Sequence, residues 1–412
     1  MSSATIASGT PNLAGLLSRR ARDLPAKPRL DVGPGGPRIS FVYGFPDPGS
    51  LPASEVAEST RAVMERAGDK ALQYGTAAGV GELIEVLLAK LKRDQGIVAG
   101  PENVLITAGG SQALALALDA FVDWGDAIIT EEPTWMGAVR AFANVGARPV
   151  PVPVDEDGTD VEALERELKR LRSQGVRAKM IYLITNFQNP SGVSTTEARR
   201  RRIVELAQAY GTLIFEDDAY HDLRYAGKKI PPIYTLDDSG STMYMGTFSK
   251  IMGAGMRLGW LVAAPEIITK LSVLKIDGGT NVFGSYVAAE WAPEHLASHI
   301  EELKRIYQRR RDLMLESLER HMPEGTTWTK PDGGFFIWVT MPETIDTGRL
   351  ATQASERGVD VLPGHTCFVG DRGHNTMRLS FSFAEDEQIE RGVEIIGEVA
   401  RGELLESGGR AS

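Results

Sequence analysis

The sequence predicts an α/β protein with a mostly parallel seven-stranded sheet, helices on both faces of that sheet, and a smaller α+β domain. Short apolar segments alternate with amphipathic segments between about residues 75 and 290, as in successive βαβ units. The apolar segments lack polar alternation, which is typical of strands buried on both faces. Beyond residue 299 the alternation ends, and a chain of 412 residues exceeds the usual size of a single core.

The strands are predicted where short runs are rich in Val, Ile, Leu and Met. They are Asn103–Thr107, Asp126–Thr130, Arg148–Val154, Lys179–Thr185, Thr212–Glu216, Thr242–Thr247 and Gly259–Ala263. Helices are predicted between them at Ser111–Val122, Met136–Val145, Asp160–Arg172 and Thr196–Tyr210. Because crossovers between parallel strands are right-handed, we expect these helices to cover both faces of the sheet.

A long helix and the smaller domain are predicted after the sheet. His299–His321 is amphipathic over its whole length. Strands are predicted at Gly334–Val339 and Met377–Phe383, and helices at Gly348–Arg357 and Asp386–Arg401. The predicted division is 1–60 for an N-terminal arm and part of the small domain, 61–295 for the large domain, and 296–412 for the linking helix and the C-terminal small domain. Prolines and glycines predict an arm over the first 35 or so residues.

Composition limits the classes of function. The formal net charge of -10 argues against non-specific binding to nucleic acid or to anionic membranes. The single cysteine, Cys367, allows no intrachain disulfide, and the N-terminus lacks the pattern of a signal peptide, so a cytoplasmic location is expected. His295 and His299 stand four residues apart without a third ligand nearby in sequence, so no metal site is predicted.

Chemically active residues follow the predicted strands. Because carboxyl ends of parallel strands meet at one edge, these residues are expected to lie together. The first strand is followed by Gly109, Gly110 and Ser111, the second by Trp135, the fourth by Asn189, and the fifth by Asp217 and Tyr220. The sixth strand ends at Thr247 and is followed by Ser249 and Lys250. One edge of the sheet therefore collects a glycine-rich helix start, an indole, an amide, a carboxylate, a phenol and an amine.

This inventory matches the requirements of pyridoxal 5′-phosphate (PLP). The helix start at Gly109–Ser111 is expected to hold the phosphate, together with Thr247, Ser249 and Arg257. Trp135 is expected to stack on the pyridine ring, and Asp217 to keep the ring nitrogen protonated. Asn189 and Tyr220 are expected to bind the ring hydroxyl. Lys250 is predicted to form the Schiff base and to move the proton at the substrate Cα.

Residues outside the large sheet are predicted to bind substrate. Arg378 lies on a predicted strand of the small domain, where a guanidinium suits bidentate capture of a carboxylate. Asn189 is expected to contact the substrate as well as the cofactor.

The chain resembles fold-type I PLP enzymes of the class I/II aminotransferases, in the branch of 2-aminoadipate, kynurenine and valine-type aminotransferases and MocR effector domains. The resemblance rests on Gln188-Asn189-Pro190-Ser191-Gly192, Asp217-Asp218-Ala219-Tyr220 and Thr247-Phe248-Ser249-Lys250, with Arg257 seven residues later. Tyr74-Gly75 is similar to the family's tyrosine that reaches the phosphate of the partner subunit. This similarity implies a homodimer with shared active sites, and Arg378 matches the family's α-carboxylate arginine.

The chain also departs from the family's pattern at several positions. Tyr43-Gly44 stands where the family has Gly-Gly, and Gly109-Gly110-Ser111-Gln112 where it has Gly-Ser-Gln-Gln. Trp135 stands where a stacking tyrosine is usual. The resemblance implies that Tyr43 and Gly44 lie at the substrate mouth and bind substrate, and that the other departures lie beside the cofactor.

The resemblance implies an aminotransferase that moves an amino group from an amino acid to a 2-oxo acid, with 2-oxoglutarate or pyruvate as the acceptor. An alternative is a PLP enzyme of specialised biosynthesis that catalyses β- or γ-elimination, replacement or carbon–carbon bond formation. A third hypothesis is a PLP-sensing module like that of MocR regulators. Too few residues precede Ile39 for a winged-helix domain, which makes this hypothesis the weakest.

Overall fold

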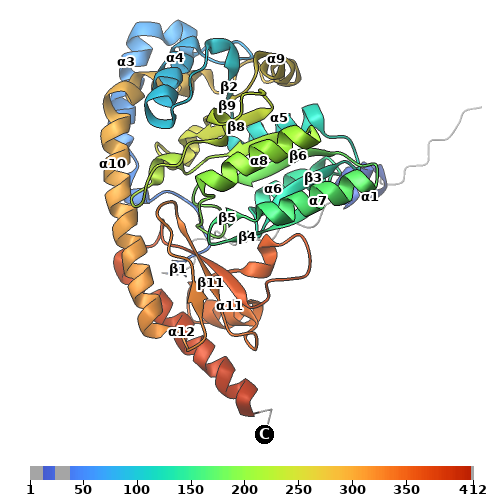
Figure 1. Ribbon diagram of the computed structural model, residues 1–412. Coiled ribbons are helices and arrows are strands. Elements are labelled where there is room, and N and C mark those ends of the chain that lie inside the picture. The colour runs from blue at the N-terminus through green and yellow to red at the C-terminus, as the bar shows by residue number, and fades with distance from the viewer. Residues whose placement is uncertain (1–12, 24–37, 410–412) are drawn as a thin grey trace, which may run out of the picture.

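A sheet of eight strands forms the framework of the computed structural model, which describes residues 13–23 and 38–409 (Figure 1). In spatial order the strands are β2 (Val104–Thr107), β9 (Gly259–Val262), β8 (Thr242–Thr247), β7 (Leu213–Asp217), β6 (Ala178–Ile184), β3 (Ala127–Glu132), β4 (Arg148–Asp155) and β5 (Gly158–Thr159). Strand β9 is antiparallel to both of its neighbours, and β5 is antiparallel to β4. The remaining pairs are parallel.

The mostly parallel sheet is confirmed, but the predicted number of seven strands is wrong because β5 was missed. With two residues, β5 is too short for an apolar pattern to reveal it. It folds back so that Thr159 pairs with Val154 at the end of β4. The rest of β4 carries prolines at alternate positions, Pro149, Pro151 and Pro153. Proline lacks an N–H donor, so it suits a strand that is paired mainly on one side.

Helices cover both faces of the sheet, as predicted. Helices α5 (Gly110–Phe121), α6 (Met136–Asn144) and α9 (Pro265–Leu274) pack on one face. Helices α7 (Val161–Ser173) and α8 (Glu197–Tyr210) pack on the other, in front of the sheet in Figure 1. Strands β2, β3, β8 and β9 are consequently buried along their whole length, which explains their lack of polar alternation.

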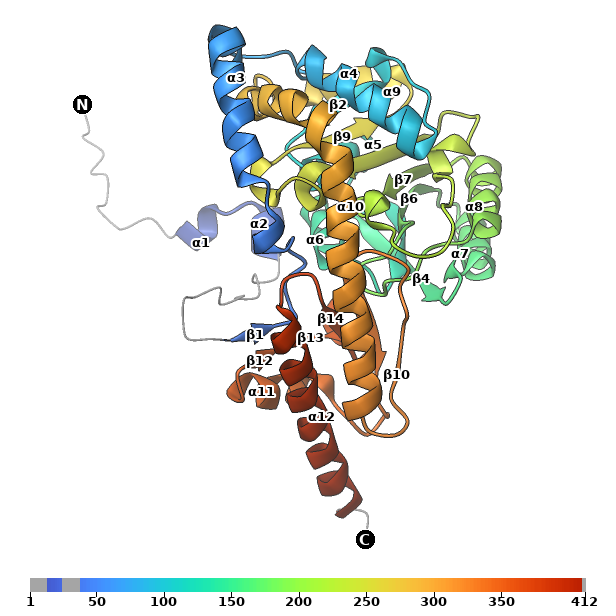
Figure 2. The same cartoon turned by 90° about the vertical axis from the view of Figure 1, so that its left-hand side faces the viewer.

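A helix of 40 residues, α10 (Val282–His321), runs alongside both the large and the small sheet (Figure 2). The predicted start at His299 is wrong. The helix begins after Asn281, whose side chain accepts a hydrogen bond from the Gly284 N–H at 3.0 Å. Most residues of the first three turns are buried, so this part has no polar stripe that would reveal a helix. Helices α3 (Ala53–Ala71) and α4 (Gly81–Lys90), which pack beside α10, were also not predicted.

The smaller sheet has the order β10 (Thr327–Trp328), β11 (Phe336–Thr340), β14 (Thr376–Ser380) and β13 (Leu362–Pro363), and it is antiparallel. Helices α11 (Thr347–Glu356) and α12 (Asp386–Gly409) accompany it. Beside it β1 (Ile39–Ser40) pairs in parallel with β12 (Val359–Asp360), so the start of the chain contributes to this region.

The predicted N-terminal arm lies largely outside the described residues. Within it, the structure describes two short helices, α1 (Leu13–Leu16) and α2 (Arg19–Asp23). The domain boundaries after residues 60 and 295 stay predictions, and α10 passes through the second of them without a break.

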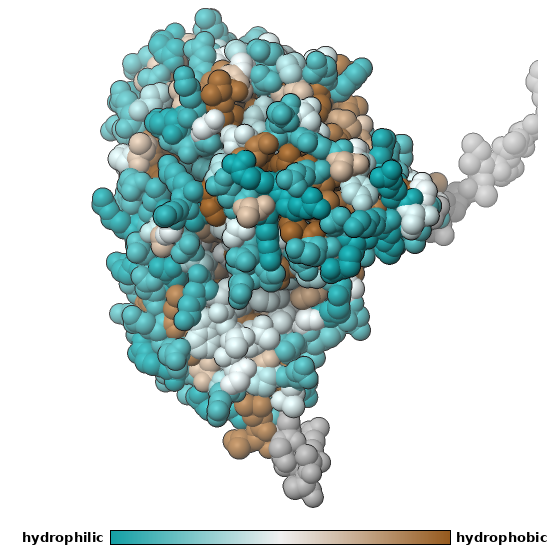
Figure 3. All heavy atoms as spheres, in the orientation of Figure 1, coloured by the Kyte–Doolittle hydropathy of each residue, from teal (hydrophilic) through white to brown (hydrophobic). Residues whose placement is uncertain are grey.

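The face of the molecule seen in Figure 3 is mostly hydrophilic, with apolar side chains scattered between polar ones. None of the helices in the described residues combines the length and the apolar character needed to cross a membrane. The cytoplasmic location stays a prediction.

Candidate active site

The candidate site is a cavity of about 340 Å³ at the carboxyl ends of the central strands, where parallel sheets bind their ligands. The structure brings most of the predicted site residues to its wall: Gly44, Gly110, Ser111, Trp135, Asn189, Asp217, Tyr220, Thr247, Ser249, Lys250, Arg257 and Arg378. Phe336, Leu362 and Arg378 reach it from the smaller sheet. The cavity is therefore enclosed by side chains of both sheets.

Asp217 is the last residue of β7 and is 5% exposed. Its Oδ2 accepts a hydrogen bond from the Tyr182 hydroxyl at 2.7 Å. Burial raises the pKa of Asp217 to about 6, although the hydrogen bond from Tyr182 and the charge of Lys250 act in the opposite direction. The Asp217 carboxylate is therefore mostly ionised at neutral pH and can pair with a cationic group in the cavity.

Lys250 ends the short turn that follows β8, and the Thr247 hydroxyl fixes this turn by accepting a hydrogen bond from the Ser249 N–H at 3.1 Å. The Lys250 Nζ donates to the Gly44 carbonyl at 2.8 Å. Burial, together with the positive charge of Arg378, lowers the pKa of Lys250 to about 8. A larger share of this amine is therefore unprotonated and nucleophilic at neutral pH than in an ordinary lysine.

The start of α5 and the loop after β8 together carry hydrogen-bond donors that suit an anion. Gly109 has φ 78° and ψ 175°, and a Cβ built there would lie 3.0 Å from the Arg257 guanidinium, so glycine is required for both reasons. The first N–H groups of a helix have no acceptor within it and are available to an anion. The hydroxyls of Thr247 and Ser249 lie 2.9 Å apart beside them, at the wall of the same cavity.

Two aromatic residues and one amide line the same cavity as Asp217 and Lys250. The Tyr220 ring lies edge-on to Phe336, and the Lys250 Nζ is 5.7 Å from the Tyr220 ring centre. Burial raises the pKa of Tyr220, so its hydroxyl remains a hydrogen-bond donor. Trp135 precedes α6, and Asn189 lies in the loop that follows β6.

Arg378 lies in the middle of β14 and is 7% exposed. Its Nη1 donates to the Asn189 Oδ1 at 2.8 Å, and its Nη2 donates to the Val42 carbonyl. Its Nε is buried and has no hydrogen-bond partner among the described residues. The guanidinium also lies over the Phe336 ring, 4.3 Å from its centre. A buried cation without a paired anion is costly, which indicates that an anionic ligand completes this site.

Three predicted residues do not line the cavity of this chain. Gly109 lies directly behind Gly110 and contacts Arg257. Tyr43 turns its ring onto Phe45 and Phe383, with ring centres 5.0 and 5.7 Å away. Tyr74 is 86% exposed.

The apolar part of the wall was not predicted, and neither was Tyr182, which lies behind the wall and donates a hydrogen bond to Asp217. The wall includes Val42, Phe45, Met136, Ile184, Met245, Phe336 and Leu362. Nothing in a single sequence distinguishes an apolar side chain that faces a ligand from one that faces the core. Tyr182, which binds Asp217, stands inside a strand that was correctly predicted, and the strand register would have been needed to identify its partner.

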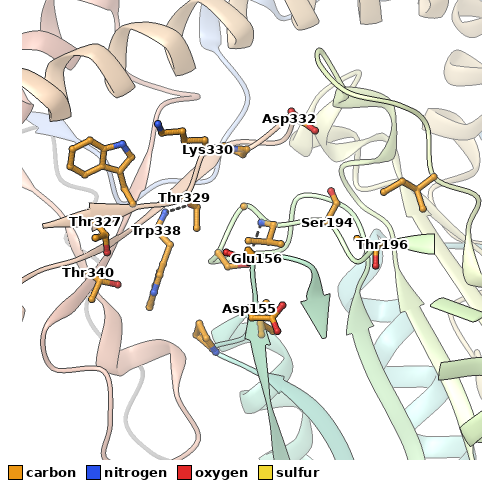
Figure 4. Close-up of a pocket in the computed structure, with 18 of the residues that line it drawn as sticks. Asp155, Glu156, Ser194, Thr196, Thr327, Thr329, Lys330, Asp332, Trp338 and Thr340 are labelled. Carbon is orange, nitrogen blue, oxygen red and sulfur yellow. Dashed lines mark hydrogen bonds between the residues drawn. The ribbon is translucent and has the colours of Figure 1, made fainter. Parts of the chain in front are cut away.

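A larger cavity of about 720 Å³ lies elsewhere, bordered by Ser191 and Gly192 of the loop that also carries Asn189. Figure 4 shows its opposing sides, with Thr327 and Trp338 from the smaller sheet facing Asp155 and Glu156 at the end of β4 and just beyond it. It contains none of the predicted site residues. Among the described residues, no group of three metal-binding side chains is arranged to hold a metal ion.

The residues of the smaller cavity fit PLP. The helix start, two hydroxyls and Arg257 form a donor set for a phosphate, and Gly109 leaves room that a side chain would fill. Asp217 suits a protonated ring nitrogen, and Lys250 suits an aldehyde. The unpaired Nε of Arg378 suits the carboxylate of an amino acid.

Comparisons with known proteins agree with this geometry. Residues 44–396 match the family model described as aminotransferase class I and II. The chain is 38% identical to aromatic-amino-acid aminotransferase 1 of Thermococcus litoralis, over 89% of this chain and 88% of that protein. It is 34% identical to the 2-aminoadipate transaminase of Thermus thermophilus, over 89% and 91%.

Solved structures give the same result. The crystal structure of Pyrococcus horikoshii kynurenine aminotransferase matches 95% of this chain and 98% of its own, with a TM-score of 0.91 and 38% identity. The predicted family, fold type, cofactor and reaction are therefore confirmed. The chain belongs to the class I and II aminotransferases and is a PLP-dependent enzyme of that family.

Proposed function

We propose that this aminotransferase prefers amino donors with large apolar or aromatic side chains. The observation that carries the proposal is the composition of the cavity wall. Arg378, Arg257 and Lys250 are its cations, and the described wall residues include no further arginine, lysine or histidine. Arg257 is assigned to the phosphate and Arg378 to the α-carboxylate. A second substrate carboxylate would lack a cationic partner, whereas an apolar side chain would contact Val42, Phe45 and Leu362.

The cofactor, when bound, supplies an electron sink for the charge that develops when the substrate Cα loses its proton. Asp217 would hold the protonated ring nitrogen of the cofactor in an ion pair. Lys250 would act as the base that takes the proton from the substrate Cα and as the acid that returns it. Arg378 would hold the α-carboxylate and so orient the Cα–H bond. Tyr220 and Asn189 would hold the ring hydroxyl by hydrogen bonds.

Mixing the loaded enzyme with single amino acids, without an acceptor, tests the donor preference. We expect kcat/KM for phenylalanine, tyrosine or leucine to exceed that for alanine by about 10- to 100-fold, since burying such a side chain contributes roughly 1.5–3 kcal/mol. Aspartate and glutamate should react more slowly than these donors. The measurement is the loss of the visible cofactor absorbance by stopped flow. Faster reaction with glutamate than with phenylalanine would contradict the preference while leaving the aminotransferase activity intact.

We further propose a homodimer in which Tyr74 reaches the partner's phosphate site. The proposal is supported by a cluster of exposed apolar side chains, the Tyr74 patch. It comprises Leu72, Tyr74, Val273 and Ile276, which are 70–93% exposed. The two segments lie side by side, because the Gly75 N–H donates to the Gly278 carbonyl at 3.0 Å. Contiguous exposed apolar surface of this kind marks a contact with another protein.

Replacing Tyr74 with phenylalanine is expected to weaken PLP binding by about 10- to 100-fold, the loss of one hydrogen bond to a charged group. The enzyme should remain dimeric by light scattering, because the ring still packs. The matched variant Ile276→Asp places a charge in the Tyr74 patch and should yield monomers. A wild-type enzyme that is monomeric at micromolar concentration, or a Tyr74→Phe variant with unchanged PLP affinity, would contradict the shared site.

A further inference from the structure

We propose that Tyr182 is a positioning residue for the reaction, whose hydroxyl holds the Asp217 carboxylate ionised and directed into the cavity. The inference rests on the proposed role of Asp217 at the ring nitrogen. Tyr182 itself does not line the cavity.

The register of the sheet places the two side chains on one face. Tyr182 of β6 pairs with Phe215 of β7, and Asp217 follows two residues later, so its side chain leaves the same face of the sheet. A tyrosine is long enough to reach this diagonal neighbour, and its hydroxyl donates to the Asp217 Oδ2 at 2.7 Å. A phenylalanine at this position would occupy the same space without reaching the carboxylate.

The Tyr182 ring has little freedom to leave this position. It is fully buried, stacks on Phe215 with ring centres 5.9 Å apart, and meets Phe142 edge-on at 5.6 Å. Burial and the charge of Asp217 raise the pKa of Tyr182 well above its ordinary value, so the hydroxyl stays protonated across the working pH range. Tyr182 is therefore a fixed and permanent donor, and donation to a carboxylate favours its ionised form.

The surroundings of Asp217 explain why it needs such a donor. Burial opposes ionisation of Asp217, and the negative charge of Asp218 opposes it too. The titratable groups that interact with Asp217 are Glu131 of β3, Tyr182 of β6, Asp218 and Tyr220 after β7, and Lys250 after β8. Of these, Lys250 and Tyr182 favour the ionised form, together with the N–H of Ala219. Since Lys250 gains and loses its proton during the reaction, its charge varies, and Tyr182 makes the constant side-chain contribution among these groups.

A matched pair of tyrosines makes the test specific. Tyr244 of β8 is also fully buried, and its hydroxyl donates to the Asp218 Oδ2 at 3.1 Å. Asp218 is adjacent to Asp217 in sequence but does not line the cavity. Tyr182→Phe and Tyr244→Phe each remove one buried hydroxyl from one carboxylate, so both should lower the melting temperature by a similar amount. The proposal predicts that the two variants differ in every property that depends on Asp217.

The dissociation constant of PLP, measured against pH by absorbance titration of the apoenzyme, should separate them. Below the pKa of Asp217, binding weakens because the protonated carboxyl cannot pair with the ring nitrogen. In Tyr182→Phe the onset of this weakening should move up by about one to two pH units, the equivalent of one charge-assisted hydrogen bond. At higher pH the affinity should return to that of the wild type. In steady-state measurements, Tyr182→Phe should lower kcat, whereas the KM of the amino donor should change less. The reason is that Arg378, which is proposed to bind the substrate carboxylate, is unaltered.

Tyr244→Phe is expected to follow the wild-type curve. The proposal is overturned if Tyr182→Phe shows the same pH dependence as Tyr244→Phe, or if its affinity loss is equal at all pH values. The variant Asp217→Asn tests the role of Asp217 separately from the positioning role of Tyr182. If Asp217→Asn lowers activity and affinity but Tyr182→Phe does not shift the curve, the positioning role fails and the proposed function stands. If Asp217→Asn resembles the wild type, the role of Asp217 itself is wrong.

Discussion

Replacement of Lys250 with alanine is expected to lower transamination by about 10²- to 10⁴-fold, the usual contribution of a positioned acid–base group. The residue is the lysine at the wall of the cavity, and it is the base proposed to act at Cα. Stopped-flow absorbance with an excess of phenylalanine measures the loss. Lys228→Ala is the control, because Lys228 is an exposed residue that borders the larger cavity instead, and its replacement should leave the rate unchanged.

The attachment of PLP offers an independent measurement on Lys250. Borohydride reduction of the loaded enzyme, followed by peptide mapping, should place the label on this residue. Because burial lowers its pKa to about 8, the attachment rate should rise from pH 7 and level off above pH 9, well below the range of an ordinary lysine. A label on another lysine, or a rate that still rises steeply at pH 10, would contradict the assignment.

Replacement of Arg378 with alanine is expected to cost roughly 2–5 kcal/mol in kcat/KM, about 30- to several thousand-fold, because one partner of a buried charge pair is removed. The expected cause is the loss of the substrate carboxylate contact, since the Arg378 Nε has no partner among the described residues. Arg378→Lys should recover part of the loss at most, because an ammonium cannot form the bidentate pair.

Substrates provide the control for Arg378. Phenylalanine and 2-phenylethylamine differ by the carboxylate that Arg378 is proposed to bind. The wild type should discriminate strongly between them, whereas Arg378→Ala should treat them nearly alike, as in a double-mutant cycle. If the variant retains the full discrimination, another group binds the carboxylate.

The catalytic part of the site could be predicted because it depends on sheet topology alone. Asp217 and Thr247 end strands that were correctly identified, and Lys250 lies just after one of them. Parallel strands bring the residues at their carboxyl ends to a common edge. The distances between these side chains were not needed for this prediction. The positions of Arg378 and Asn189 could not be deduced in this way, since their 2.8 Å hydrogen bond joins two different sheets.

The remaining features could not be predicted because burial removes the signal. The first turns of α10 are buried on most sides, so their apolar pattern has no period. Phe45 and Leu362 face the cavity, but each stands in a stretch that resembles any other apolar connection. The partner of the Tyr182 hydroxyl depends on the strand register, which a two-residue shift would change.

The cavity residues assigned to the cofactor and those assigned to the substrate come from different parts of the chain, and this has an evolutionary consequence. The groups that the chain provides for the cofactor in its own cavity lie between Gly109 and Arg257, whereas Val42, Phe45, Leu362 and Arg378 come from the two ends. Mutations near the termini can therefore reshape the substrate pocket without disturbing the machinery that activates the cofactor. Because the two functions lie in separate segments of the chain, enzymes with this fold can evolve specificity for different amino acids while the reaction stays the same.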